Sequence, residues 1–465
     1  MIARPWTDDL PKCKSTSVAS YFSRLGGGSY ANSNDDYLCF YCQTEDNTCL
    51  YGLFEPHNGL EAAKFIMQRM AAEILFPPPT PNNSDEEIRE RLRNAFSAVE
   101  NAYTEIYDGM IAERTSLGKR LKILTAETKP LLNITENTNP IIARLKEIDQ
   151  HLSAGATVVV ALVVNNKLFV ANVGECRALL CRTDDNSVLR VVQLTADHSV
   201  NNEDELLRLA QLGVDVGKLR HAQYLGNQPG TRCLGNYLVK RLHKAFPQLS
   251  AAAAEPVIAT AEAHGPVALD HYSRFLVLVS AGVYKRIQES RGSSEQTNKQ
   301  LAQIIVEHFR NTTDFQNVSQ TVLQRIEEEF VSFCVKNNLT PKPNTHMSLL
   351  IRNFNFPLPN DQGPSVVAAK NVAVRFNPIV HSKTNTLLNE IDSDLSTETN
   401  EGTDSIVDTN RSIADTNRSN DSNSDIYPSR LQDRDKKIKG YVDFSPYYEN
   451  VAVARRNGTL PNFIN

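Results

Sequence analysis

A short stretch near the start of the chain, YGLFEPHNG at residues 51–59, carries side chains suited to chemistry. Apolar residues lead to Glu55, and the PHNG that follows is a turn sequence before a helical pattern. This order predicts a strand that ends in a tight turn, with Glu55 presented at the end of the strand. Binding and catalytic residues are common where a loop follows a rigid strand, so Glu55 is the first candidate.

Three cysteines form a second candidate site, for a zinc ion. Cys39 and Cys42 have the CxxC spacing of zinc ligands, and Cys49 follows them. No second pair of suitable spacing follows, and the first pair lies in a strand-like run, YLCFYC. Buried or free thiols are therefore the favoured interpretation, and a zinc site is the alternative.

Aromatic residues return near the end of the chain, after a long polar stretch. Phe444, Tyr447, Tyr448 and Val451 stand at i, i+3, i+4 and i+7, which is typical of one apolar face of a short helix. Pro446 fits only in the first turn of such a helix. This helix has no core of its own, so we expect it to bind in the groove of a partner protein. The alternative is that it packs on the folded part of this chain.

The elements that must position these residues alternate between strands and helices. Strands are predicted at residues 38–42, 49–54, the β-branched part of 151–164, 167–181, 191–194, 274–279 and 347–354. Helices are predicted after Gly59, after Ser84, through most of 110–152, at 203–212, and near 294–309 and 318–337. We expect two long helices within 110–152 to lie across one face of a sheet. Antiparallel strands interleaved with paired helices predict an α+β fold, a two-sheet sandwich flanked by helices.

The 465 residues suffice for one large core with extensions. Residues 1–36 are polar and glycine-rich, so we expect an N-terminal arm, followed by a folded domain at 37–356. Residues 357–438 are rich in Ser, Thr, Asn and Asp and poor in aromatics, which predicts a disordered linker. Residues 439–455 are then expected to hold the short C-terminal helix.

The net charge of −5 is small for this length, so charge alone indicates neither a nucleic-acid partner nor a membrane surface. The first residues, MIARPWTDDL, lack the apolar core of a signal peptide. The longest apolar run, at 158–164, is too short to cross a bilayer. We therefore expect a soluble, reduced, cytoplasmic protein.

Seven motifs in order resemble those of the type 2C protein phosphatases, which are metal-dependent. The turn FEPHNG resembles the FxDGHGG of that family, in which the Asp bridges two divalent cations. The other six are SAGAT at 153–157, ANVGECRA at 171–178, LTADH at 194–198, RCLGN at 232–236, SAGVY at 280–284 and THMS at 345–348. The resemblance implies the β-sandwich of that family, with helices on both sides.

The resemblance also locates the metal-site positions, and carboxylates are missing from most of them. These positions are Asp36, Glu55, Pro56, Asn236, Ala281 and Thr345. Glu55 keeps an acid but is one methylene longer than the Asp of the family, and Ala281 offers no side-chain oxygen. Thr345 and Asn236 are neutral where the family has acids. Two divalent cations require several hard oxygen ligands, so we predict an inactive domain with no catalytic residue, bound metal or cofactor.

One branch of this family matches more closely, through PWTDDLP at 5–11, NNEDEL at 201–206, LLIRNF at 349–354 and YVDF at 441–444. Members of that branch are pseudophosphatase adaptors that promote autophosphorylation of a TGF-beta-activated MAP kinase kinase kinase. They also bind a p38-type MAP kinase, and they act in stress, cytokine and innate immune signalling. The resemblance implies that the kinase is bound by Tyr441, Val442, Asp443, Phe444, Tyr447, Tyr448 and Val451.

Three hypotheses follow for the function of the chain. The first is a non-catalytic adaptor that activates the kinase. The second is a weakly active metal-dependent Ser/Thr phosphatase that uses Glu55, Asp36 and a metal-bound water. The third, which is weaker, is that the degenerate pocket binds a ligand such as a phosphopeptide.

Overall fold

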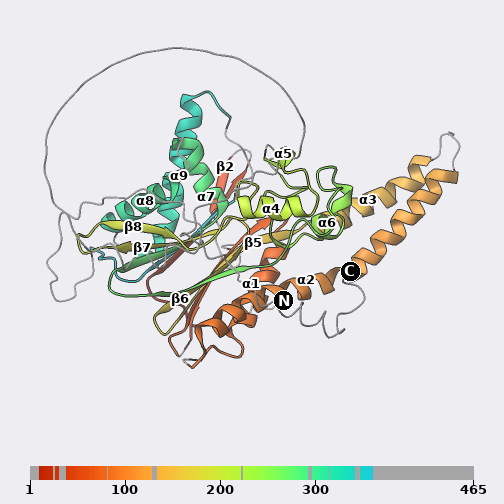
Figure 1. Cartoon of the computed structure of the whole chain (residues 1–465). Coiled ribbons are helices and arrows are strands. Elements are labelled where there is room, and N and C mark those ends of the chain that lie inside the picture. Colours follow the sequence, from red (N-terminus) through yellow and green to blue (C-terminus); the bar gives the residue numbers. More distant parts are fainter. Residues whose placement is uncertain are drawn as a thin grey trace, which may run out of the picture. The chain divides into compact units, whose positions relative to one another are not determined.

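The computed structural model describes residues 10–24, 27–30, 38–44, 46–80, 82–127, 134–220, 224–291, 296–312, 314–340 and 346–359. These residues belong to the first of two compact units, Met1–Val380. They form two six-stranded antiparallel sheets with helices packed on both (Figure 1). This arrangement confirms the predicted α+β sandwich.

One sheet has the strand order β2-β1-β12-β11-β7-β8. In that order the strands are Gly27–Tyr30, Thr16–Arg24, His346–Asn353, Ser273–Val279, Arg177–Thr183 and Leu189–Gln193. Every neighbouring pair is antiparallel. The strands come from both ends of the described chain, and β12 lies between β1 and β11.

The other sheet has the order β10-β6-β5-β4-β3, and the short β9 pairs with the end of β5. These strands are Glu262–Ala268, Lys167–Val173, Gly155–Val164, Cys49–His57 and Cys39–Gln43, with β9 at Leu234–Gly235. Between β5 and β6, Asn165 and Asn166 have φ angles of 52° and 59°. Two positive φ angles suit a tight hairpin turn, for which an Asn-Asn dipeptide between two strands is a typical signal.

Three hydrophobic layers hold the sandwich together. The layer between the sheets contains Tyr51 and Leu53 of β4 with Leu276 and Leu278 of β11. The intervening β4 residues, among them Phe54, face the helices on the other side of their sheet. β4 is thus buried on both faces, and this rigid strand carries Glu55.

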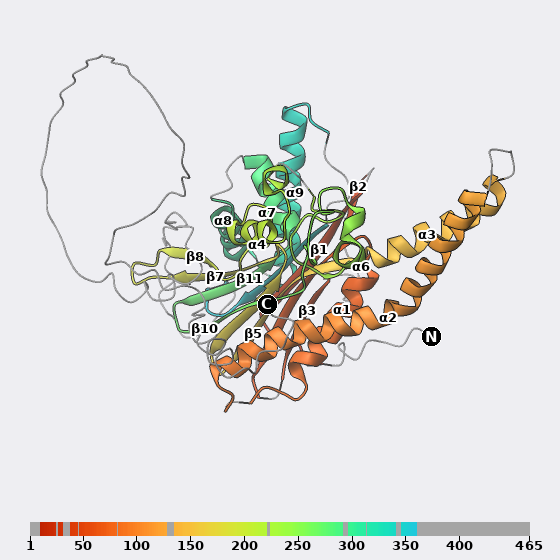
Figure 2. The same cartoon turned by 45° about the vertical axis from the view of Figure 1, so that its right-hand side comes forward.

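Each sheet is covered by its own helices (Figures 1 and 2). The sheet that contains β4 packs on α1 (Glu61–Leu75) and on the start of α2 (Asp85–Glu127). The sheet that contains β12 packs on α7 (Ala281–Arg291), α8 (Thr297–Asn311), η4 (Phe315–Asn317) and α9 (Val318–Lys336). A smaller lobe with its own apolar core holds α4 (Glu203–Gln211), α5 (Val216–Leu219), α6 (Tyr237–Arg241) and η3 (His243–Ala245).

The helix predicted after Ser84 is present as α2, and Ser84 caps its N-terminus. The backbone N–H of Glu87 donates to the Ser84 hydroxyl at 3.2 Å, and the Ser84 N–H donates to the Glu87 carboxylate at 2.7 Å. This reciprocal pair is a capping box, which satisfies two amide groups at the start of the helix.

Residues 110–127 and 134–152 are helical, but the expectation that two helices within 110–152 lie across a sheet is wrong. The start of α2 packs on β6 and β10, whereas α3 (Ile134–Leu152) packs on α2 and α6. The later half of α2 and α3 run side by side beyond the sheets (Figure 2). Arg114–Asp149 at 2.6 Å and Arg144–Glu113 at 2.8 Å join the two helices.

The expectation that residues 1–36 form an arm is wrong for the part that the structure describes. β1 pairs along its length with β12 near the middle of its sheet, and β2 extends that sheet. Two serines of β1 are buried and hydrogen-bonded: the Ser17 hydroxyl accepts from the Ser319 N–H at 2.9 Å, and the Ser20 hydroxyl bonds that of Ser348 at 2.8 Å. A strand that buries serines lacks the apolar alternation by which strands are recognised.

Several predictions fall outside the described residues. Asp36, Thr345, the linker from residue 360 on and the C-terminal segment at 439–455 all lie there. Cys39 and Cys42 are described, and both are buried free thiols on β3, as favoured above. Of the helices that the structure describes, none combines the length and the apolar character that a membrane span requires.

Candidate functional site

Glu55 lies near the end of β4, and its carboxylate meets the N-terminus of α7. The N–H of Ala281 donates to one carboxylate oxygen at 3.1 Å, and the N–H of Gly282 donates to the other at 3.3 Å. The Thr157 hydroxyl and the Cys176 thiol lie 3.4 and 3.6 Å from the first oxygen. Amides at the start of a helix have no partner within the helix, so Glu55 acts as a cap supplied by a distant strand.

The surroundings of Glu55 both oppose and favour its charge. Burial raises the pKa of Glu55 above its usual value, while the charge of Lys285 and the amide hydrogen bonds of Ala281 and Gly282 act in the opposite direction. A negative charge at this position is also stabilised by the helix dipole. The positive partners of this carboxylate are therefore groups of α7.

A second acid, Glu175, lies in the turn between β6 and β7. It is 9% exposed, and the Lys285 Nζ lies 2.5 Å from its Oε2. The Tyr284 hydroxyl donates to the Glu175 carbonyl at 3.1 Å, so two neighbouring residues of α7 hold this turn. Burial opposes the charge on Lys285, but Glu175 outweighs burial and raises the pKa of the lysine.

Pro56 and His57 continue β4 beyond Glu55, opposite Ala156 and Gly155 of β5. Within the described chain, His57 Nε2 is buried without a hydrogen-bond partner. Burial, aided by the charge of Lys240, lowers the pKa of His57 to about 4, so the ring is neutral at pH 7. His57 is thus a packed structural residue rather than a proton donor.

Asn236 has a structural role at the start of α6. It has a positive φ of 55°, and its side-chain oxygen accepts from the Val239 N–H at 3.4 Å. Its amide NH₂ donates to Asn227 and Gln228 at 3.0 Å each. Asn and Asp tolerate a left-handed backbone that other side chains avoid, so Asn236 serves the turn and the cap.

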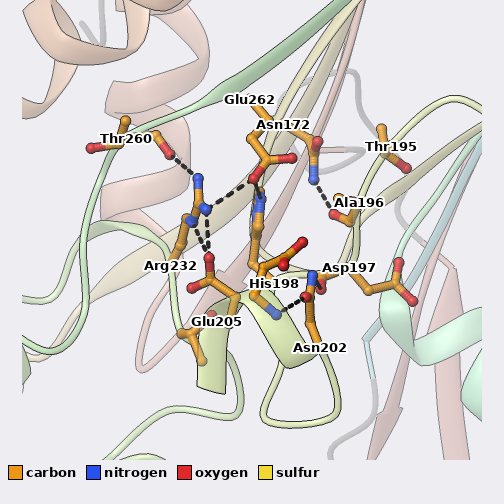
Figure 3. Close-up of polar contacts among 12 residues, drawn as sticks. Asn172, Thr195, Ala196, Asp197, His198, Asn202, Glu205, Arg232, Thr260 and Glu262 are labelled. Carbon is orange, nitrogen blue, oxygen red and sulfur yellow. Dashed lines mark hydrogen bonds and ion pairs between the residues drawn. The ribbon is translucent and has the colours of Figure 1, made fainter. Parts of the chain in front are cut away.

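The LTADH and RCLGN motifs meet in a polar cluster (Figure 3). Gly174 N–H donates to His198 Nδ1 at 3.0 Å, and His198 Nε2 lies 3.3 Å from Glu262. Arg232 lies between Glu262, at 2.9 Å, and Glu205. Burial opposes ionisation of Glu205, yet its bonds with Arg232 lower its pKa to about 2. The cluster joins α4 to β10.

Asp197 of the LTADH motif is paired rather than free. Arg177 binds it with a closest contact of 2.5 Å, and the guanidinium lies 3.7 Å from the centre of the Tyr284 ring. Arg177 also donates to Asn298 at 2.9 Å. This acid is neutralised beside α7, and it offers no unpaired charge to a metal ion.

The residues described around Glu55 do not fit two divalent cations. Such a pair carries four positive charges and requires several oxygen ligands. Glu55 is committed to two amide N–H groups and Glu175 to an ammonium, while Ala281 contributes only a methyl group. Across the described ranges, no group of three His, Cys, Asp or Glu side chains is arranged to hold a metal ion.

The structure brings together some of the sequence-predicted positions. Glu55 and position 281 are in direct contact, but through the backbone amide of Ala281. Asn236 is engaged in its own turn, and Asp36 and Thr345 lie outside the described residues. Sequence reasoning missed Lys285. The sequence signal for Lys285 is its spacing from Ala281, because a residue four positions later in a helix lies on the same face and so near the same site.

Comparison with known proteins places this geometry in a family. A model of the family "Protein phosphatase 2C" matches residues 60–329. TGF-beta-activated kinase 1 and MAP3K7-binding protein 1 of Caenorhabditis elegans is 24% identical over 314 residues, which cover 66% of this chain and 73% of that protein. Probable protein phosphatase 2C 40 of Arabidopsis thaliana is 29% identical over 227 residues, covering 47% of this chain and 43% of that protein.

Solved structures of low sequence identity are also similar. The serine-threonine phosphatase 2C of Toxoplasma gondii has a TM-score of 0.43 and 12% identity, covering 74% of this chain and 96% of that chain. A C. elegans sex determining protein has a TM-score of 0.44 and 13% identity, covering 75% of this chain and 65% of that one. The family match alone spans more than half of the 465 residues. The chain therefore belongs to the protein phosphatase 2C family.

Proposed function

We propose that this chain is a non-catalytic adaptor that binds a TGF-beta-activated MAP kinase kinase kinase and promotes its autophosphorylation. The observation that carries the proposal is the state of Glu55, whose two oxygens accept the N–H groups of Ala281 and Gly282. A similar C. elegans protein has a name that describes it as a binding protein of such a kinase.

The absence of phosphatase activity follows from charge and ligands. A phosphatase of this family uses divalent cations to activate water and to neutralise the phosphate. Here the carboxylate of Glu55 is stabilised by a helix N-terminus, and that of Glu175 by Lys285. Position 281 has lost its oxygen ligand. Neither water activation nor phosphate neutralisation then has the ions that it needs.

Kinase binding is proposed for residues 441–451 on the basis of their sequence. An amphipathic helix commonly lays its aromatic face into a groove of the partner. Phe444 is the best candidate for the buried anchor, because large aromatic anchors dominate such interfaces.

The test is binding of the full chain to the catalytic domain of the kinase. Phe444→Ala should weaken binding by about 30-fold or more, since an aromatic anchor contributes at least about 2 kcal/mol. Tyr427→Ala, an aromatic truncation within the linker, is the matched control and should leave affinity unchanged. Equal affinities of Phe444→Ala and the wild type would refute the docking proposal.

We also propose a p38-type MAP kinase as a second partner, and the cytoplasm, in stress, cytokine or innate immune signalling, as the setting. These proposals rest on the resemblance to the adaptor branch. Co-precipitation of a p38-type kinase with the full chain, compared with a chain that lacks 383–430, tests the second partner. Equal recovery with both chains would exclude residues 383–430 as its binding site.

A weakly active metal-dependent Ser/Thr phosphatase is the second candidate function. The observation in its favour is that two carboxylates, Glu55 and Glu175, remain close to α7. It predicts Mn²⁺-dependent phosphate release from a phosphopeptide, lost in Glu55→Ala. Release that persists in Glu55→Ala would indicate a contaminating phosphatase instead.

A further inference from the structure

We propose that Lys285 is a tethered cation that takes over the electrostatic role of a divalent metal ion in this domain. The proposal rests on the proposed function, because it explains how the degenerate centre stays folded without metal. The proposal also goes beyond the proposed function, since it assigns Lys285 as the replacement for the metal ion and predicts that removing the charge of Lys285 restores cation binding.

The position of Lys285 on α7 makes this substitution possible. Ala281 begins the helix, and Lys285 follows one turn later on the same face. Side chains of a helix tilt toward its N-terminus, so the lysine extends back toward the carboxylates. Its Nζ lies 2.5 Å from Glu175, and its charge acts on Glu55 as well.

Most of the negative charge at this centre is neutralised without an added ion. Glu55 and Glu175 carry two negative charges, and Lys285 carries one positive charge. The N-terminus of α7 contributes the equivalent of about +0.5. Asp197, the next acid, is paired with Arg177. The remaining charge is about −0.5 instead of the −2 of the two carboxylates alone, so much less attraction is left for a divalent cation.

The burial of Glu175 makes a cationic partner necessary. The residue is 9% exposed, and the described chain gives its carboxylate one cationic contact, that with Lys285. A buried carboxylate without a partner is strongly destabilising. In a metal-binding relative, an ion can supply that partner from solution; here the chain supplies it from α7, and no ion has to bind.

The test compares Lys285→Gln with Lys167→Gln in the full chain. Lys167 forms an ion pair of 2.8 Å with Asp85 at the surface, so its substitution removes the same charge away from α7. Mn²⁺ is titrated into each protein by calorimetry, and melting is followed with and without Mn²⁺. Wild type and Lys167→Gln should show no Mn²⁺ response up to millimolar concentrations. Lys285→Gln should bind Mn²⁺ at least about tenfold more tightly, because the ammonium no longer repels the ion.

The melting temperature gives an independent readout. Without metal, Lys285→Gln should melt below the wild type, and Mn²⁺ should restore part of the difference, because a ligand that binds the folded state stabilises it. A Lys285→Gln protein that does not respond to Mn²⁺ in either measurement would overturn the proposal. Mn²⁺ binding by the wild type itself would instead overturn the proposed lack of metal, which is a different failure.

A second variant covers the case in which Lys285→Gln does not fold. Lys285→Gln combined with Glu175→Gln removes both charges, so no buried carboxylate is left unpaired. This double variant should be more stable than Lys285→Gln and should not respond to Mn²⁺. If it is no more stable than the single variant, Lys285 does not act by neutralising Glu175 and the proposal is wrong.

Discussion

The substitution Glu55→Ala distinguishes two roles of Glu55, that of a helix cap and that of a metal ligand, because the two roles predict opposite changes in stability. In the metal-free form of a working site, clustered carboxylates repel one another, and removing one commonly stabilises the fold. In this chain Glu55 accepts the N–H groups of Ala281 and Gly282. Its removal leaves both amides without their partner, so we expect the free energy of unfolding to fall.

The magnitude follows from the contacts. Each hydrogen bond to a charged acceptor contributes about 1.5–3 kcal/mol, and the charge at the helix N-terminus adds about 0.3–1 kcal/mol. Removing a partly buried carboxylate also relieves its desolvation, which opposes these gains, as the raised pKa of Glu55 indicates. The net loss should be about 2–3 kcal/mol. At about 2.1 cal/mol/K per residue over about 350 residues, this lowers Tm by about 3–4 °C.

The assay is urea unfolding of the full-length wild type and Glu55→Ala, both in chelator. Glu86→Ala is the matched control, because Glu86 lies in the first turn of α2 with its side chain 61% exposed. Among the described residues it pairs with Arg89 and Arg93 at the surface. That control should change stability by less than about 1 kcal/mol. A Glu55→Ala protein as stable as the wild type, or more stable, would refute the capping role.

Three further predictions concern residues outside α7. The pKa of His57 falls from 6.5 to about 4 on folding, so the unfolded chain takes up a proton that the folded protein does not. The stability that the neutral His57 contributes is present above pH 6.5 and is lost as the pH falls toward 4. Between pH 7 and 4.5 the wild type should therefore lose about 2 kcal/mol more than His57→Gln in urea titrations. Parallel pH profiles of the two proteins would contradict this prediction. Ser84→Ala should cost about 1 kcal/mol in the same assay, because the capping box of α2 is lost, and an unchanged midpoint would refute that role. Gly155→Ala should lower Tm strongly, since its new Cβ would lie 2.5 Å from His57 Nε2 and 2.6 Å from the Leu234 carbonyl oxygen. A Tm within about 1 °C of wild type would mean that β9 shifts to relieve the clash at little cost, and would contradict this prediction.

The sequence predicts elements well where local patterns are strong. The β-branched run of β5, the Asn165-Asn166 turn and the Ser84 cap all carry short-range signals, and all three occur in the structure. β1 was not predicted, because Ser17 and Ser20 are buried and hydrogen-bonded to partners about 300 residues away. β10 was also missed, because Gly265-Pro266 within it indicates a turn.

The candidate site could be located from the sequence but not understood from it. The motifs identified Glu55 and Ala281 as neighbours, and the structure brings them into contact. The capping role of Glu55 depends on where α7 begins, 226 residues later in the chain, which no local pattern reveals. Lys285 could have been noticed from its spacing to Ala281. Its partner Glu175, however, lies in the turn between β6 and β7, and only the folded structure shows that the two side chains meet.

Metal binding by the unmodified chain decides between an adaptor and an enzyme. Mn²⁺ and Mg²⁺ are titrated by calorimetry into the full-length protein after treatment with chelator. Because Lys285 and the start of α7 already neutralise Glu175 and Glu55, we predict no binding heat up to millimolar metal. Two tight sites would contradict the proposed lack of metal and return the phosphatase hypothesis to first place.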